Sequence, residues 1–340
     1  NNNFAWKDGN YVLGKGELDK YGLYVLPVGV SDQYCVAKEG TDGIPMINGE
    51  YDVATITQLY IEALSNEGFK NADTNSFSVL ATPGTQELLV QNAAIELCTS
   101  RGDCIYLIDV PKQYCSSKSG IKSAVEWSNS FQSSFAAIYY GWFSIANPYS
   151  ASENIELPAS VFIAPKMIAI DKTVGAFYAP AGVRNGLISV SDYDYSPDTA
   201  DRDLMLNDQL HNVVNPIYYN NTYGMICMGQ KTTDRTTSPL NRVGVRRMTN
   251  MIKRVLRSRL LALLFEANND ASRTRARKYC NDLLGNLQKD GMVDSYTVNV
   301  VSGTGSARNE LSVYLSFAPF GLIEKIYVYL NITDAGVTIT

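Results

Sequence analysis

The sequence predicts an open, mostly parallel α/β sheet domain followed by an α+β domain with a basic helix and a three-stranded antiparallel sheet. From residue 51 onward, short apolar stretches alternate with amphipathic stretches, which is typical of a parallel sheet covered by helices. Acidic and aromatic residues interrupt this pattern over residues 192–203. Two helical stretches and three strands of period two follow, which indicates a second unit of α+β type.

The elements of the first unit follow from the spacing of its apolar residues. Helices are expected over residues 51–69, 87–98 and 121–135, and buried strands over residues 77–81, 104–110 and 136–145. Pro83 and Pro111 follow two strand ends, where open α/β sheets often bind ligands. No glycine-rich phosphate-binding motif follows these strands, so the sequence does not predict a nucleotide site.

The second unit begins with a helix expected over residues 204–214, because Pro216 bars the preceding residue from helical geometry. A strand is expected over residues 223–228 and a helix over residues 246–265. Asp270 or Ser272 caps a further helix that ends at Gly291. Strands are then expected over residues 295–301, 311–317 and 326–332.

Three domains are predicted from this organisation. Residues 1–45 form an N-terminal strand and loop segment that packs on the middle domain, residues 46–203 form the middle α/β domain, and residues 204–340 form the C-terminal domain. With 340 residues, of which 45% are hydrophobic, the chain is long enough for two ordinary cores.

The residue composition argues against catalysis, metal binding and a membrane role. No apolar stretch approaches the roughly 18 residues that span a bilayer. The six cysteines lack the Cys-x-x-Cys spacing of zinc sites and are expected to be reduced, buried thiols. His211 is the single histidine, so a Ser-His or Cys-His pair would have to use it. We therefore expect no enzyme activity, no cofactor and no metal.

Basic residues concentrate between Lys231 and Lys278. This stretch of 48 residues holds 13 lysines and arginines against three acids, a net charge of +10, so the rest of the chain carries −15. At 100° per residue, one side of the helix over residues 246–265 is basic and the opposite side is apolar. The basic side holds Arg246, Arg247, Lys253, Arg254 and Arg257, and Arg273 and Arg277 follow on the next helix.

The wheel also predicts how this helix is buried. Arg259 falls on the apolar side and is expected to need an acidic or carbonyl partner, since an unpaired buried charge is costly. Residues 260–265 are apolar all round. The helix is therefore expected to begin at the surface and to end buried.

Three interpretations of the basic stretch compete: a solvated face, a nucleic-acid groove, and a docking surface for an acidic protein. Single-strand binding requires aromatics between the basic residues, and the stretch holds only Phe265, with Tyr279 directly after it. The −15 elsewhere would also repel a long polyanion. Protein docking is favoured, and one chain with both signs of charge suits heterologous self-assembly.

Several ordered sequence blocks resemble the tail sheath proteins of contractile-tailed phages. The blocks are residues 179–186 (Ala-Pro-Ala-Gly-Val-Arg-Asn-Gly), 206–207 (Leu-Asn), 215–217 (Asn-Pro-Ile), 229–232 (Gly-Gln-Lys-Thr), 238–253 and 264–269 (Leu-Phe-Glu-Ala-Asn-Asn). Block 238–253 is Ser-Pro-Leu-Asn-Arg-Val-Gly-Val-Arg-Arg-Met-Thr-Asn-Met-Ile-Lys. The resemblance covers residues 44–333 and is strongest after residue 179.

The resemblance implies a structural subunit rather than an enzyme. Sheath subunits stack in helical rows around a tail tube and contract to drive the tube through the host envelope for genome delivery. The implied partners are other sheath subunits, the tail tube protein, and the baseplate and tail terminator proteins, with no nucleic acid and no membrane. The implied location is the virion tail, with assembly in the host cytoplasm. Residues from 204 onward would form the inner domain that faces the tube.

Within this resemblance, the seven basic residues named above are expected to contact neighbouring subunits or the tube. Two alternatives remain: a sheath subunit of a bacterial contractile injection system, and a nucleic-acid-binding protein that uses residues 231–278. The chain opens on Asn1 without a methionine, which predicts a fragment or processed product. The linking N-terminal arm of the family is expected to be missing, which predicts a monomeric fragment.

Overall fold

The computed structural model describes residues 4–7, 10–13, 46–47, 50–51, 53–147, 154–303, 309–324, 330–333 and 336–339. The chain divides into two units, residues 1–59 and 60–340. The first unit contains an antiparallel pair, β1 (Phe4–Lys7) with β2 (Asn10–Leu13), and a second pair, β3 (Met46–Ile47) with β4 (Glu50–Tyr51). Helix α1 (Val53–Ser65) follows. Apart from β1 and β2, the predicted segment 1–45 lies outside the described residues.

A four-stranded sheet forms the centre of the second unit. Its strands are β5 (Val79–Ala81), β6 (Ile105–Asp109), β7 (Ala136–Tyr139) and β12 (Val214–Asn215), in the order β12-β7-β6-β5. All three pairings are parallel. The prediction of a parallel sheet is confirmed.

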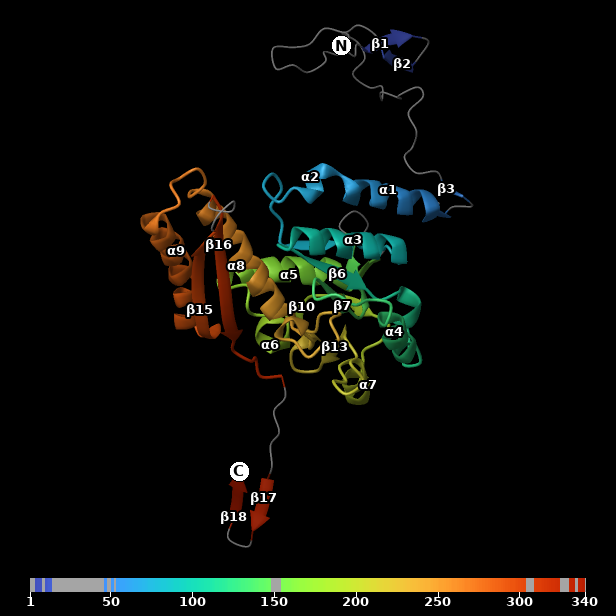
Figure 1. The fold of residues 1–340 in the computed structure, drawn as a ribbon. Helices are drawn as coiled ribbons and strands as arrows, with labels where there is room; N and C mark the ends of the chain where they lie inside the picture. Colours follow the sequence, from blue (N-terminus) through green and yellow to red (C-terminus); the bar gives the residue numbers. More distant parts are fainter. Residues whose placement is uncertain are drawn as a thin grey trace. The chain divides into compact units, whose positions relative to one another are not determined.

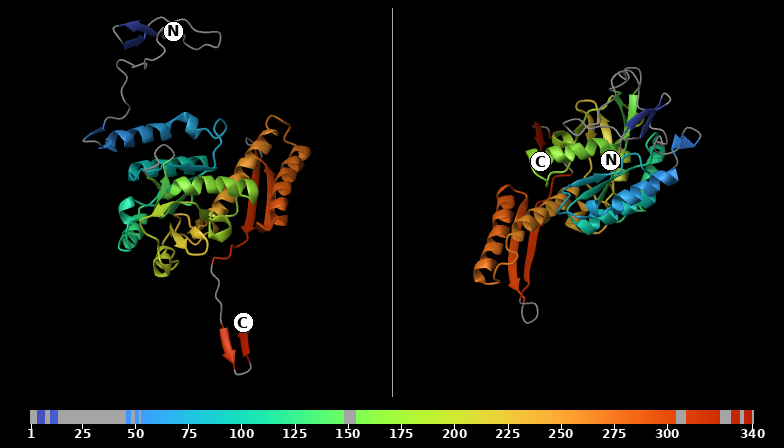
Figure 2. Two further views of the ribbon diagram at one scale, coloured as in Figure 1. Left: turned by 180° about the vertical axis from the view of Figure 1, so that it is seen from behind. Right: turned by 90° about the horizontal axis from the view of Figure 1, so that it is seen from above.

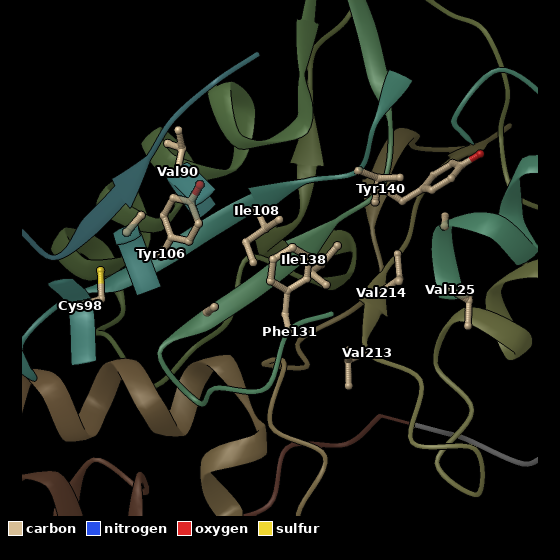
Figure 3. Close-up of a cluster of buried hydrophobic side chains, with 14 of the residues drawn as sticks. Val90, Cys98, Tyr106, Ile108, Val125, Phe131, Ile138, Tyr140, Val213 and Val214 are labelled. Carbon is tan, nitrogen blue, oxygen red and sulfur yellow. The ribbon is translucent and has the colours of Figure 1, made fainter. Parts of the chain in front are cut away.

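The two faces of this sheet belong to different cores because side chains alternate along a strand. Tyr106 and Ile108 face the first core, which also contains apolar residues of α3 (Leu88–Arg101) and α4 (Gly120–Ser128). Figure 3 shows this cluster, with the Tyr106 ring beside Val90 and Cys98. Ile105 and Leu107 face the second core, to which α5 (Ala159–Thr173) contributes. Burial on both faces explains why the first four residues of β6, before Asp109, are apolar or aromatic.

Two predicted elements end earlier than expected. The helix predicted over residues 121–135 stops as α4 at Ser128, and Phe131 enters the core from the turn that follows. The strand predicted over residues 136–145 is two strands, because Gly141 at φ 123° separates β7 from β8 (Trp142–Ala146). This backbone angle favours glycine, so the break is encoded locally.

Two small antiparallel sheets flank the parallel one. Strand β8 pairs with β9 (Asn154–Pro158) and β11 (Asp192–Tyr193). Strand β14 (Gly224–Cys227) pairs with β13 (Ile217–Asn220) and β10 (Leu187–Ile188). The short helices α2 (Glu67–Lys70) and α6 (Gly182–Asn185) and the 3-10 turn η1 (Lys112–Tyr114) complete this part.

The helix predicted over residues 204–214 is wrong. The helix present is α7 (Thr199–Met205), which begins earlier because Asp198 and Asp201 form a reciprocal capping box. Val214 and Asn215 then pair with β7 as the fourth parallel strand. The division of the chain between residues 203 and 204 stays a prediction, although β12 lies beyond it and completes the parallel sheet.

The C-terminal part is built on a third core. The 3-10 turn η2 (Pro239–Asn241) leads into α8 (Val243–Leu261), α9 (Asp270–Lys289), β15 (Val293–Ser302) and β16 (Leu311–Pro319). Figures 1 and 2 show α9 lying along the β15–β16 pair with α8 beside it. Helix α9 buries one stripe at helical spacing, formed by Ala276, Cys280, Leu284 and Leu287.

The predicted three-stranded sheet is not formed by the described residues. Strands β15 and β16 pair only with each other among them. Of the third predicted strand, 326–332, residues 326–329 lie outside the described part, and β17 (Leu330–Thr333) pairs with β18 (Gly336–Ile339) instead. No helix in the described ranges is long and apolar enough to cross a membrane.

Candidate protein-docking surface

The first two predicted docking residues are buried inside their own chain. Arg246 is 7% exposed, lies 4.0 Å above the Phe135 ring and hydrogen-bonds Ser134 Oγ. Arg247 is 4% exposed, donates to Met167 O at 2.8 Å and Tyr178 O at 3.1 Å, and pairs with Asp171. The expectation of an exposed face is wrong for both arginines, because α8 begins against the α/β part.

Burial changes the protonation energetics of this pair of arginines. Loss of solvent lowers the pKa of Arg246 to about 10. Loss of solvent also lowers the pKa of Arg247, and the neighbouring Asp171 carboxylate opposes the shift. Both guanidinium groups remain cationic at neutral pH. Their hydrogen bonds serve to join α8 to the chain that precedes it.

The next turns of α8 continue this contact. Asn250 Nδ2 donates to Cys104 O at 2.9 Å. Lys253 is exposed, but its ammonium lies against Gly102, where a Cβ would collide with it. Gly102 is the C-cap of α3, so this cation lies at the negative end of the α3 dipole. Arg254 is half-buried beside Asp171, and Arg257 pairs with Asp73 at 3.1 Å.

The C-terminal end of α8 is exposed, whereas the sequence predicted that it is buried. Leu261 is 62% exposed, Leu264 59% and Phe265 105%, so the end expected to be buried is open to solvent. The helix ends at Leu261, before the apolar run can pack as helix. Arg259 is also exposed, so it needs no buried partner.

Helix α9 carries the remaining predicted cations. Arg273 pairs with Asp270 in its own first turn, and Arg275 pairs with Glu266. Arg277 and Lys278 are exposed and form no ion pair with any residue of the described part. The exposed, uncompensated positive charge therefore lies on α9 rather than on the first half of α8.

Several of the sequence blocks converge in space around Asn215 and Lys231. Asn215 Nδ2 donates to Ile138 O at 2.9 Å and to Lys231 O at 2.8 Å, while Lys231 N donates to Asn215 Oδ1 at 2.7 Å. A Cβ at Gly229 would lie 2.5 Å from Asn215 Oδ1, which explains the glycine there. This hub fixes the chain after β14 against the edge of the parallel sheet.

The Lys231 ammonium is held within the same hub. It donates to Leu206 O at 2.8 Å and Asn212 O at 3.0 Å, and it pairs with Asp208 at 2.8 Å. Burial lowers the pKa of Lys231, and the hydrogen bond with Asp208 opposes that shift. Lys231 lies within the block of residues 229–232, but no sequence motif marks it as part of a site.

A cavity of about 290 Å³ opens beside this hub. Its wall includes Leu206, Met228, Gln230, Leu322 and Ile323. Gln230 Nε2 donates to Glu324 Oε1 at 2.8 Å, and Glu324 also accepts two hydrogen bonds from Arg242, at 2.6 and 2.9 Å.

The amino-acid sequence alone does not predict this cavity, because its wall comes from four separate segments of the chain. The described ranges hold no cluster of three histidines, cysteines or acids placed to bind a metal ion.

Comparisons with known proteins agree with this arrangement. Residues 235–333 match the family described as phage tail sheath C-terminal domain. The tail sheath protein of Enterobacteria phage T4 is 24% identical over 270 residues, which is 73% of this chain. The chain spans 40% of the length of that T4 relative.

Solved sheath structures share the fold. The contracted sheath complex of PVC, an extracellular contractile injection system, has a TM-score of 0.63 at 18% identity and covers 84% of this chain and 81% of its own. The contracted helical sheath of the anti-feeding prophage has a TM-score of 0.57 at 19% identity, with coverages of 88% and 77%. Residues 235–333 are therefore similar to the phage tail sheath C-terminal domain, and the chain shares sequence similarity with a phage tail sheath protein and the fold of contractile sheath proteins.

Proposed function

We propose that this chain is a structural subunit of a contractile phage tail sheath, which polymerises around a tail tube and contracts to drive the tube through the host envelope. The observation that carries the proposal is the 270-residue similarity to the T4 tail sheath protein. The sheath fold over 84% or more of the chain supports it. The baseplate matches support an association with a baseplate, and the tube and tail terminator are further proposed partners.

The burial pattern divides the seven predicted contact residues into two groups. Arg246 and Arg247 are buried within the chain, whereas Arg257 pairs with Asp73 and Arg273 with Asp270 at the surface, and the Lys253 ammonium lies against Gly102. The prediction of inter-subunit or tube contact therefore rests mainly on Arg277 and its neighbours on α9. An exposed charge pair contributes up to about 1 kcal/mol, so one contact can break and re-form during contraction while many copies bias the assembly.

Electron microscopy of the protein with its own tail tube tests the proposal. Sheath-like tubes from the unmodified protein are the result that the proposed function predicts and that the sequence-based prediction of a monomeric fragment excludes. A variant with both Arg277→Glu and Lys278→Glu should give fewer or shorter tubes. The matched control is Lys122→Glu on α4, which changes a side chain that is 82% exposed and already paired with Glu126. Failure of the unmodified protein to form tubes under conditions that assemble a reference sheath would contradict the proposed function.

The nucleic-acid alternative is less well supported, because buried arginines supply part of the basic stretch on which it depends. A gel shift at rising salt separates the two. Binding to nucleic acid through exposed cations would weaken steeply with salt, and we expect no salt-dependent shift.

A further inference from the structure

The turn between α8 and α9 presents an apolar group to solvent. We call Leu261, Leu264 and Phe265 the apolar tip, and their side chains are 62%, 59% and 105% exposed. Phe265 has φ 65°, a conformation that is a genuine outlier for a bulky residue. Such strain persists only where the surrounding structure holds it, and it is often found at functional positions.

Neighbouring contacts hold the apolar tip in place. Glu266 pairs with Arg275 on α9, and Ser272 Oγ donates to Ala267 O at 2.7 Å. Asn268 Nδ2 donates to Glu310 O at 3.0 Å, which ties the turn to the residue before β16. The turn is therefore held by polar contacts, while the Phe265 side chain is fully exposed and does not pack in a core.

The 290 Å³ cavity beside the Lys231 hub offers a complementary shape, and we call it the Gln230 pocket. A cavity of about 150 Å³ is enough to bind benzene, so this one can accept a phenyl ring. Met228 is 41% and Ile323 84% exposed in its wall, which leaves apolar surface open to a partner. Gln230 is 9% exposed, and its Oε1 has no hydrogen-bond partner among the described residues.

The tip and the pocket of one chain cannot meet each other. Val243 N donates to Gln230 O at 2.7 Å, so the pocket lies at the start of α8, whereas the tip follows its end. The 19 residues of α8 separate the two by about 28 Å, at 1.5 Å per residue. A Phe265 ring in this pocket must therefore come from another molecule.

We propose that the apolar tip of one copy docks in the Gln230 pocket of a second copy. Residues 261–278 around the tip carry four basic side chains against Glu266 and Asp270, a net charge of +2, and Arg277 and Lys278 are the cations without an ion pair in the described part. The lining of the pocket carries Asp208 and Glu324 against Lys231, and Arg242 outside the lining pairs with Glu324. Different surfaces meet in this contact, so it is heterologous and generates an open helical row. The inference rests on the proposed sheath function and deepens it by naming one subunit contact.

Site-directed cross-linking tests the contact in the full chain. Phe265→Cys and Met228→Cys place thiols on the tip and on the pocket, and all the native cysteines of the described part are buried. With a short bismaleimide, a mixture of the two variants should give covalent dimers, and a chain carrying both should give a ladder. The controls are the unmodified chain and a mixture of Met228→Cys with Leu89→Cys, whose position is 66% exposed on α3.

Phe265→Gly provides an independent measurement by sedimentation. Glycine accepts φ 65° without strain, so the variant should unfold at a higher urea concentration than the unmodified chain. Loss of the ring from a desolvated pocket should weaken self-association about 30-fold. Greater stability together with weaker association is a combination that a merely solvent-exposed phenylalanine would not produce.

The outcomes separate this inference from the proposed function. Cross-linking at the control level overturns the tip-to-pocket contact, even if tubes form in the microscope and the sheath function stands. A ladder without tubes supports the contact and argues against the sheath function. Cross-linking of the tip to added tube protein, but not to Met228→Cys, overturns the contact in favour of a tube-facing tip. Unchanged sedimentation of Phe265→Gly also overturns it.

Discussion

Arg247→Met tests whether buried hydrogen bonds anchor the start of α8. Methionine keeps most of the apolar stem but removes every donor. The substitution deprives Met167 O and Tyr178 O of their partner and leaves the Asp171 carboxylate without its cation.

The expected loss of stability follows from these contacts. Removing one partner of a buried ion pair costs about 3–5 kcal/mol. The Asp171 side chain is 27% exposed and can regain some hydration, so we expect the lower end, about 3 kcal/mol. Arg247→Lys keeps the charge but cannot reach three acceptors with one ammonium, so it should lose about half as much.

Urea unfolding followed by tryptophan fluorescence measures the free energy of unfolding. The matched control is Arg277→Met on α9, which is exposed and should change the free energy by less than about 0.5 kcal/mol. Adding Asp171→Asn to Arg247→Met should recover about 1 kcal/mol, because the stranded carboxylate is removed. A loss below about 1 kcal/mol for Arg247→Met would show that α8 is not anchored in this way.

Two further predictions concern a buried carboxyl group of strand β6 and glycines of helices α8 and α9. Burial raises the pKa of Asp109 from 3.8 to about 6, while hydrogen bonds from Ser160 oppose the shift. Its protonated form therefore favours the fold. The unfolding free energy of the unmodified chain, relative to that of Asp109→Asn, should fall by roughly 2 kcal/mol as pH rises from 4 to 7. Parallel urea titrations that gave the same difference at both pH values would contradict this prediction. A Cβ at Gly244 would collide with Phe177 O, so Gly244→Ala should lower the free energy of unfolding by at least about 2 kcal/mol. A Cβ at Gly285 meets only Tyr296 OH at 3.2 Å, so Gly285→Ala should raise it by about 0.5 kcal/mol. Equal effects of the two substitutions in thermal unfolding would refute this distinction.

The parallel sheet could be predicted because its central strands are buried on both faces. Residues 105–108 of β6 are apolar or aromatic without interruption before Asp109, and this run lacks the spacing of an amphipathic helix. Strand β12 could not be predicted, since a strand of two residues carries no periodicity. Its Asn215 side chain is hydrogen-bonded to the backbone of Lys231, 16 residues further along the chain.

The basic residues lie on α8 and α9, but the burial predicted for the two ends of α8 is reversed. The start of α8 is buried and its end is exposed. A helical wheel assumes one buried side along the whole helix. Helix α8 instead enters the second core at Val243 and the third core from Val245 onward, so arginines on the supposed surface side meet backbone carbonyls. Sequence alone does not show that carbonyls from distant segments will be there to accept.

The way α8 is held has a mechanical consequence. Seven of its nine buried residues lie within its first eight positions, so the helix is held most firmly at its N-terminal end. Bending at this end is resisted, because the Arg247 bonds and the packed Gly244 leave no free space there. A force applied at the far end of α8 would therefore pass into the α/β part and into α9, with which α8 shares the third core, rather than being taken up by a hinge at the start of the helix.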